Sequence, residues 1–231
     1  MAQILYGDVS PSGRLPYTVA KQATDYGDLL SPCQAPRNSL SPQCDFAEGP
    51  NIDYRSFLAR NMTPRFEFGF GLTYSTFNYS DLVISVNATA TANNTIVAPV
   101  YANGTTNNND SNNNTALIGV GGLESLFTSV GTVEATITNT GTVAAAEVAQ
   151  LYLQIPTKYT NSTNPVTRVL RGFQKVTIQP NATARVSFDL RAKDVSSWDM
   201  VRQAWVVPKG QFNVWVGKSV LDTPLVGKFA T

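Results

Sequence analysis

The sequence predicts a mainly β protein whose larger, C-terminal part is a two-sheet antiparallel sandwich. From Ser75 onward, short stretches that alternate apolar and polar residues recur at regular spacing, and turn residues separate them. These stretches are rich in Val, Ile, Thr, Phe and Tyr, which favour strands. The part before Ser75 is irregular, so we expect it to precede the sandwich as a connector and not as an independent unit.

Each expected strand contains side chains that alternate between two faces. For example, Ala149, Leu151 and Leu153 are expected to point inward, with Gln150, Tyr152 and Gln154 outside. The strands are expected around Phe77–Ile84, Val133–Ile137, Ala149–Ile155, Val169–Ile178, Val186–Leu190, Trp205–Val207 and Phe212–Val216. A single helical turn is expected at Asp194–Asp199, and Pro208-Lys209-Gly210 predicts a hairpin between the last two strands.

Three segments of the chain fall outside this regular pattern. In residues 1–24 the pattern predicts the end of a helix running into Gly7, then a turn and a strand at Leu15–Val19. This strand is too short to be stable alone, so we expect it to pack on residues that precede this chain. Residues 25–73 are expected to form an ordered connector. Within the sandwich, residues 74–231, an insertion at about 87–122 is rich in Asn and Thr and is expected to be solvated and glycosylated.

The composition excludes several classes of function. The formal net charge is +1, with 17 basic and 16 acidic residues and no basic run, so neither nucleic-acid nor membrane-surface binding is expected. No apolar stretch reaches the length of a bilayer span, and the start of the chain shows no signal-peptide pattern. Histidine is absent, which removes Ser-His-Asp chemistry and imidazole metal sites. We therefore expect no metal ligand and no cofactor-binding residue.

The two cysteines, Cys33 and Cys44, flank a short segment of the connector. Two cysteines cannot close a zinc site without histidine, so the pattern favours a disulfide, with two free thiols as the alternative.

Asn-x-Ser/Thr sequons occur throughout the chain and favour a secreted glycoprotein. A secreted chain without a signal sequence is expected to be a piece of a longer one. The candidate glycosylation sites are Asn61, Asn78, Asn87, Asn93, Asn103, Asn109, Asn113, Asn161 and Asn181.

The segment Arg65–Leu82 begins like a dinucleotide-binding loop but does not complete the pattern. Gly69 and Gly71 are spaced correctly, yet Tyr74 occupies the position of the third small residue and a strand follows instead of a helix. The glycines are better explained by close backbone approach, and the surrounding aromatic side chains by burial of a seam.

Carboxylates are the one acid–base chemistry that the composition still allows. The connector offers Asp45, Glu48, Asp53 and Glu67, but no spacing places two of them on one face of an element. Asp53 could form a local ion pair with Arg55 or contact a substrate, and a structural role is favoured because charged loop residues are usually solvated or paired. We therefore assign no catalytic residue.

Tryptophan and tyrosine side chains could also form a platform for sugar rings. Core packing, interdomain packing and a carbohydrate platform all remain open for Trp198, Trp205 and Trp215. Because Trp215 lies between the inward-facing Val214 and Val216, it is expected to face away from their core, against the helical turn at Asp194–Asp199 or solvent.

Several motifs in one order resemble the C-terminal part of fungal β-glucosidases of glycoside hydrolase family 3. They are GDVSPSGRLPYTVAK, FAEGPNIDYRSF, TPRFEFGFGLTYSTF, LRGFQKV, DVSSWDMVRQAWVVPKGQFNVWVG and LVGKF. The resemblance implies that residues 1–24 end an α/β sandwich domain and that residues 74–231 form a fibronectin type III-like (immunoglobulin-like) domain. The EFGFG form favours the β-glucosidase branch over the β-xylosidase branch.

The resemblance also implies what the chain lacks. The family's nucleophile and acid/base both lie upstream of the segment resembling GDVSPSGRLPYT, so the chain alone is expected to be inactive. Its expected role is to support upstream catalytic domains of a secreted enzyme. The expected interdomain seam is Phe66, Phe68, Phe70, Tyr74 and Phe77. The alternative is a free-standing carbohydrate-binding or adhesive sandwich, with β-glucan surfaces as possible partners.

Overall fold

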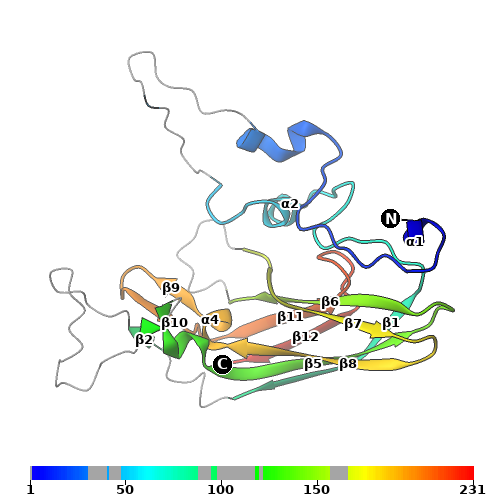
Figure 1. Ribbon diagram of the computed structural model, residues 1–231. Coiled ribbons are helices and arrows are strands. Elements are labelled where there is room, and N and C mark those ends of the chain that lie inside the picture. The colour runs from blue at the N-terminus through cyan, green and yellow to red at the C-terminus, as the bar shows by residue number, and fades with distance from the viewer. Residues whose placement is uncertain are drawn as a thin grey trace.

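The computed structural model describes residues 2–30, 41, 48–87, 95–97, 118–119, 122–156 and 166–231. Two antiparallel sheets face each other and form a sandwich, and the N-terminal segment and connector lie over one of its outer faces (Figure 1). The fold is mainly β, as the sequence predicts. No helix in these ranges is long and apolar enough to cross a membrane.

The first sheet has the order β1-β5-β8. Its strands are β1 (Phe77–Val86), β5 (Ser129–Asn139) and β8 (Thr183–Arg191). The second sheet has the order β12-β11-β6-β7. Its strands are β6 (Ala145–Gln154), β7 (Val169–Ile178), β11 (Gln211–Gly217) and β12 (Leu225–Ala230). All pairings are antiparallel, which matches the predicted sandwich.

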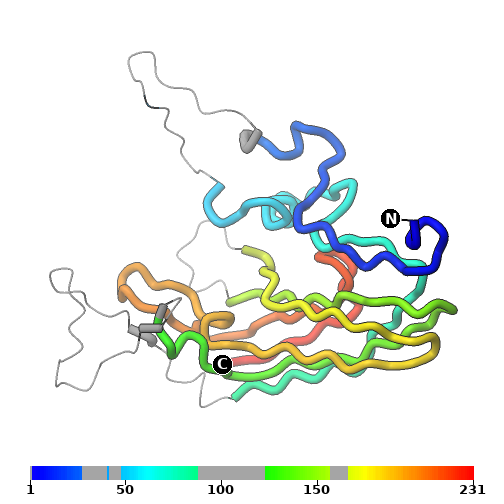
Figure 2. The backbone as a smooth tube through the Cα atoms, in the orientation of Figure 1, coloured from blue at the N-terminus to red at the C-terminus, as the bar shows by residue number. Residues whose placement is uncertain are grey.

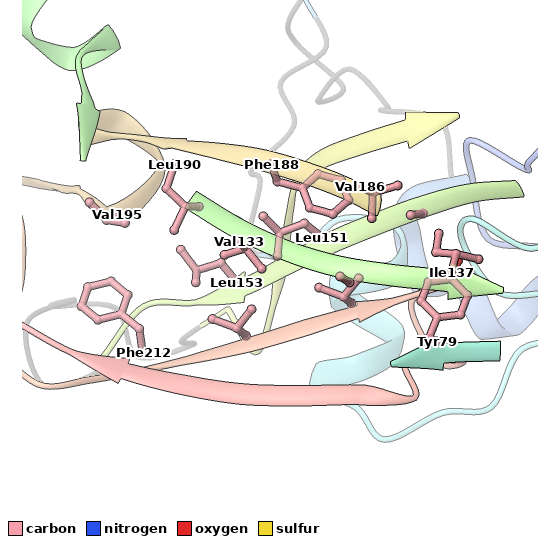
Figure 3. Packing of buried hydrophobic residues seen from close by; sticks show 14 of the residues in the cluster. Tyr79, Val133, Ile137, Leu151, Leu153, Val186, Phe188, Leu190, Val195 and Phe212 are labelled. Carbon is pink, nitrogen blue, oxygen red and sulfur yellow. The ribbon is translucent and has the colours of Figure 1, made fainter. Parts of the chain in front are cut away.

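The core lies between the two sheets and follows the predicted alternation. Val133 and Ile137 of β5 and Leu190 of β8 face Leu151 and Leu153 of β6, and all five are fully buried (Figure 3). Burying one such side chain stabilises the fold by about 1.5–3 kcal/mol, so the alternation fixes which face of each strand points inward.

Shorter elements surround the sandwich. A small sheet has the order β2-β10-β9, and β3 pairs with β4. The strands are β2 (Thr95–Val97), β3 (Ile118–Gly119), β4 (Gly122–Leu123), β9 (Ser197–Asp199) and β10 (Ala204–Val206). The helices are α1 (Ala2–Leu5), η1 (Ala23–Leu30), α2 (Tyr54–Ala59), η2 (Glu124–Phe127) and α4 (Ala192–Val195). Within the Asn-rich insertion, β2 pairs with β10.

Two local predictions are wrong, and one strand was missed. The strands around Trp205 and Phe212 do not form a hairpin, because β9 and β2 already occupy both edges of β10, while β11 pairs with β6 and β12. The predicted helical turn begins at Ala192 and ends at Val195, and the following residues form β9. Strand β12 was not predicted at all, although it forms an edge of the second sheet.

The expected strand at Leu15–Val19 is not a regular strand; it forms an isolated bridge between Val19 and Phe66 and backbone hydrogen bonds at Leu15. Figure 2 shows this segment, in dark blue, running beside the cyan part of the connector. The connector itself is less irregular than expected, because it contains η1 and α2. Cys33, Cys44 and Asp45 lie outside the described residues, as do the sequons Asn93, Asn103, Asn109, Asn113 and Asn161.

Candidate functional site

The N-terminal segment crosses the outer face of the sandwich by pairing with the Gly69–Gly71 segment. The Leu15 N–H donates to the Phe70 carbonyl and the Gly69 N–H donates to the Leu15 carbonyl, each at 2.8 Å. Gly69 has a φ of 81°, and a Cβ there would collide with the side chain of Gln150. A Cβ at Gly71 would collide with the Gly13 carbonyl. The glycines therefore serve close backbone approach, as the sequence predicts.

A buried ion pair joins this N-terminal segment to the sandwich. Arg14 Nη2 lies 2.6 Å from Glu147 Oε2, and the Glu147 side chain is fully buried. Arg14 Nη1 also donates to the Gly71 carbonyl at 3.2 Å, and Tyr79 Oη donates to Glu147 Oε1 at 2.8 Å. One carboxylate of β6 thus receives donors from the N-terminal segment and from β1.

The electrostatics of this network follow from burial. Burial raises the pKa of the Glu147 carboxyl above its ordinary value, and the Arg14 charge and the Tyr79 hydrogen bond oppose that rise without cancelling it. Burial, followed by the negative charge of Glu147, raises the pKa of the Tyr79 hydroxyl, so Tyr79 acts as a proton donor in the hydrogen bond. The arrangement is suited to holding two segments together and offers no exposed acid or base.

The sequence contains a signal for this ion pair in the position of Glu147. Glu147 has the same parity in its strand as Ala149 and Leu151, which the alternation directs into the core. A carboxylate on an inward-facing position needs a cationic partner, because burying an unpaired charge is costly. Arg14 is that partner. Because it lies far from Glu147 in the sequence, local patterns could not identify the pair.

A second contact region lies beneath α2. Tyr54, Tyr152 and Val220 are its buried members, and partly buried side chains from the connector and the sheet surround them: Leu58, Phe68, Leu170 and Trp215. Tyr54 and Phe68 have ring centroids 4.5 Å apart, and the Leu170 N–H donates to Tyr54 Oη at 3.1 Å. The connector therefore packs on the sheet through an aromatic cluster as well as through backbone hydrogen bonds.

The polar residues on this face of β6 are buried as well. Gln150 Nε2 donates to the Gly69 and Lys218 carbonyls, at 3.0 and 2.6 Å, and Tyr152 Oη donates to Gln150 Oε1 at 2.6 Å. Gln150 and Tyr152 point away from the main core, as predicted, but the connector covers them. The prediction is therefore correct about the face of the sheet on which Gln150 and Tyr152 lie. It is wrong about exposure, because both side chains are buried.

The five residues of the expected interdomain seam do not form one surface. Phe77 is buried in the main core and Phe68 packs in the cluster beneath α2. Phe66 and Phe70 pack on each other with centroids 5.1 Å apart, and Phe66 is exposed. Tyr74 is also exposed, and its Oη donates to the Ile4 carbonyl at 2.7 Å. Only the outer part of this set could contact another domain.

Exposed apolar side chains gather on the N-terminal segment and the neighbouring connector. Tyr6 is 85% exposed, Leu5 76% and Leu72 70%, and Val9 and Tyr17 are exposed too. Large exposed apolar groups on adjacent segments are typical of an interaction surface. We call this set, Leu5, Tyr6, Val9, Tyr17 and Leu72, the N-terminal apolar surface.

Asp53 and Glu67 of the connector serve structural roles, whereas Glu48 is half-buried. Asp53 accepts from the Thr18 N–H at 2.9 Å and from Thr18 Oγ1 at 3.1 Å, and among the described ion pairs it does not pair with Arg55, so that alternative is wrong. Glu67 accepts from Ser219 Oγ at 2.7 Å. Among the residues with described positions, no group of three or more Asp, Glu, His or Cys side chains could hold a metal ion.

The three tryptophans occupy different environments. Trp198 and Trp205 form an edge-to-face pair with centroids 5.8 Å apart, and Trp198 is 38% exposed. Trp215 faces away from the core of Val214 and Val216, as predicted, and the Arg168 guanidinium carbon lies 4.2 Å from its ring centroid. Of the sequons in described regions, Asn61, Asn78, Asn87 and Asn181 are all exposed.

Comparisons with known proteins match both parts of the chain. Residues 1–74 match the model of the glycosyl hydrolase family 3 C-terminal domain, and residues 147–220 match that of the fibronectin type III-like domain. A curated relative from Aspergillus niger, named "Probable beta-glucosidase M", is 45% identical over 232 residues. A "Probable beta-glucosidase L" from Aspergillus fumigatus is 42% identical over 229 residues.

The chain spans only about a quarter of these relatives. It aligns over 100% of its own length with 27% of the Aspergillus niger protein, and over 99% with 27% of the Aspergillus fumigatus protein. Among solved structures, a beta-D-glucoside glucohydrolase from Trichoderma reesei gives a TM-score of 0.77 at 37% identity and covers 99% of this chain and 28% of that one. A family 3 beta-glucosidase from Neurospora crassa gives 0.77 at 30% identity, with coverages of 98% and 33%. The chain belongs to glycoside hydrolase family 3 and corresponds to the C-terminal part of longer members of that family.

Proposed function

We propose that this chain is the C-terminal portion of a secreted β-glucosidase and that it supports the domains in which β-D-glucosides are hydrolysed. The observation that carries the proposal is the N-terminal apolar surface, which leaves Leu5, Tyr6 and Leu72 largely exposed in a region that matches the family's C-terminal domain. The relatives that it resembles are about four times longer, so there is polypeptide available to cover this surface.

The chain alone is proposed to be inactive. A retaining glycosidase needs two carboxyl groups about 5–5.5 Å apart on opposite sides of the bond it breaks. Two of the described connector carboxylates already have structural partners, because Asp53 binds Thr18 and Glu67 binds Ser219. The pure chain should therefore release no phenol from an aryl β-glucoside. Turnover that is abolished by Glu48→Gln or Asp53→Asn would contradict the proposal.

Secretion and glycosylation are proposed from the sequons. Asn61, Asn78, Asn87 and Asn181 lie on the surface, where a glycan can be attached. Expression in a fungal secretory host should give protein whose mass falls on endoglycosidase treatment. Secreted protein with an unmodified mass at all four sequons would contradict the glycosylation part of the proposal.

A second candidate function, binding of a β-glucan surface, is favoured by the exposed Trp198 beside Trp205. Stacking of a sugar ring on Trp198 predicts affinity for soluble β-glucan that Trp198→Ala abolishes. Equal retention of wild type and variant on a glucan gel would exclude this function.

A further inference from the structure

Two arginines lie beside the hydrogen bond that holds α2 on the outer face of β7. Tyr54 Oη accepts from the Leu170 N–H at 3.1 Å. Arg55 follows Tyr54 in α2, and Arg171 follows Leu170 in β7. Arg171 is also placed at an irregularity of the sheet, where the pairing with β6 shifts between Leu151 and Tyr152. Both arginine side chains are partly buried.

Neither guanidinium has a hydrogen bond or an ion pair in the part of the chain that the structure describes. The Nε atoms of Arg55 and Arg171 are buried and have no hydrogen-bond partner. Arg55 has one further contact, with its guanidinium carbon 5.9 Å from the Tyr54 ring centroid. A guanidinium carries five donors, and buried donors in proteins are normally paired. Arg14 offers a contrast, because its Nη groups bind Glu147 and the Gly71 carbonyl.

The charges around Arg55 and Arg171 do not neutralise these two side chains. Asp194 of α4 attracts Arg171, but it already forms an ion pair with Arg191 at 2.9 Å. Arg55 and Arg191 both repel Arg171, and burial is the main reason that the pKa of Arg171 is lowered. Asp53, the nearest carboxylate in sequence to Arg55, is bound to Thr18. Among the residues that the structure describes, these two positive charges therefore have no carboxylate of their own.

We propose that Arg55 and Arg171 together bind one carboxylate group, and that an Asp or Glu side chain of the preceding region of the enzyme supplies it. The planar fork of a guanidinium matches the two oxygens of a carboxylate, and two forks can hold one group from both sides. The source of the carboxylate rests on the proposed function. Arginine is enriched at protein interfaces, and the relatives have about three quarters of their length outside the aligned region.

The carboxylate site can be tested on the chain itself with acetate as the probe. The measurement is the NMR shift of the arginine Nε–Hε signals during titration with sodium acetate, with sodium chloride at equal ionic strength as the reference. The site predicts that two signals shift saturably with acetate and that Arg55→Met and Arg171→Met each remove one of them. Each variant should weaken acetate binding about tenfold or more, because a charge-assisted hydrogen-bonding partner is lost.

Arg185→Met is the matched control, since Arg185 lies on the surface and pairs with Glu134 at 2.6 Å. Its removal should leave the acetate titration unchanged. If a methionine variant does not fold, Arg171→Lys keeps the charge and removes the fork, and the titration of the wild type still decides the question. A linear shift shared by exposed arginines, or no shift at all, would overturn the site.

The source of the carboxylate is tested by repeating the titration on this chain fused behind the preceding residues of the Aspergillus niger relative. If that region supplies the side chain, the two signals should already lie near their acetate-saturated positions and should not respond to acetate. A response that persists would overturn the internal source and indicate a free carboxylate ligand. Hydrolysis of a β-glucoside by the same fusion tests the proposed function separately, so the two failures can be told apart.

Discussion

Arg14 Nη2 lies 2.6 Å from Glu147 Oε2, and this contact ties the N-terminal segment to a central strand of the sandwich. Glu147 is fully buried and Arg14 is 13% exposed, so the pair is shielded from water. Removing one partner should therefore leave a buried charge without compensation. Arg14→Met is expected to lower the free energy of unfolding by roughly 3–5 kcal/mol.

The double variant Arg14→Met/Glu147→Met is the control for this prediction. It removes both charges and should recover most of the loss, because a buried ion pair contributes little over apolar groups of similar volume. Urea denaturation of the wild type, the single variant and the double variant measures this coupling. Equal destabilisation by the single and the double variant would show that the ion pair is not the cause.

Glu147 also predicts a dependence of stability on pH. Its pKa is higher in the folded chain than in the unfolded one, mainly because of burial, so the folded state holds the proton more tightly. Stability relative to Glu147→Gln should therefore fall as the pH rises from about 4 through the raised pKa, and should level off above it. Unfolding free energies of both proteins across this range provide the test. A difference that stays constant, or one that grows with pH, would contradict the assignment.

The backbone conformation of Gly69 predicts that a substitution there lowers the free energy of unfolding. Gly69→Ala places a Cβ at a φ of 81° and against the Gln150 side chain, whose amide donates to the Gly69 carbonyl. The variant should lose roughly 2–4 kcal/mol through backbone strain and the displaced hydrogen bond. Gly13→Ala is the matched control, because a Cβ there meets no atom within 4 Å and the φ is not positive. Its midpoint of denaturation should stay within about 0.5 kcal/mol of wild type.

The hydrogen bond between Tyr54 and Leu170 should stabilise the packing of α2 on the sheet. Tyr54→Phe removes the acceptor of the Leu170 N–H while it keeps the ring that packs on Phe68, and it should cost about 1–3 kcal/mol. Tyr6→Phe, on a side chain that is 85% exposed, should cost almost nothing. Faster amide exchange at Leu170 in Tyr54→Phe, with the sandwich core unchanged, would locate the effect in this contact. Unchanged exchange at Leu170 would mean that this hydrogen bond does not hold the helix.

The alternation of side chains was sufficient to predict the sandwich and its inward-facing residues, because local periodicity records which face of a strand is buried. Val133, Leu151 and Val214 all lie in the core, as expected. Pairing partners were not predictable in this way. Strand β10 pairs with Thr95–Val97, which lie within the insertion, and no local pattern relates these segments. The hairpin prediction failed for the same reason.

The candidate site was only partly predictable. The roles of Gly69 and Gly71 followed from the backbone freedom of glycine, whereas Arg14, Asp53 and Glu67 each bind a side chain far away in sequence. Asn139 illustrates the limit. It was predicted to end a strand, and it does, but its buried side chain also accepts from Ser75 and donates to the Val143 and Ile178 carbonyls. Such contacts are defined only when several strands have come together.

The central claim is that this chain supports catalysis that takes place elsewhere in the polypeptide. The most direct measurement is the rate of aryl β-glucoside hydrolysis by three proteins: this chain, the preceding residues of the Aspergillus niger relative, and the fusion of the two. The account predicts hydrolysis by the fusion alone. Hydrolysis by this chain by itself, or equal rates with and without it, would contradict the account.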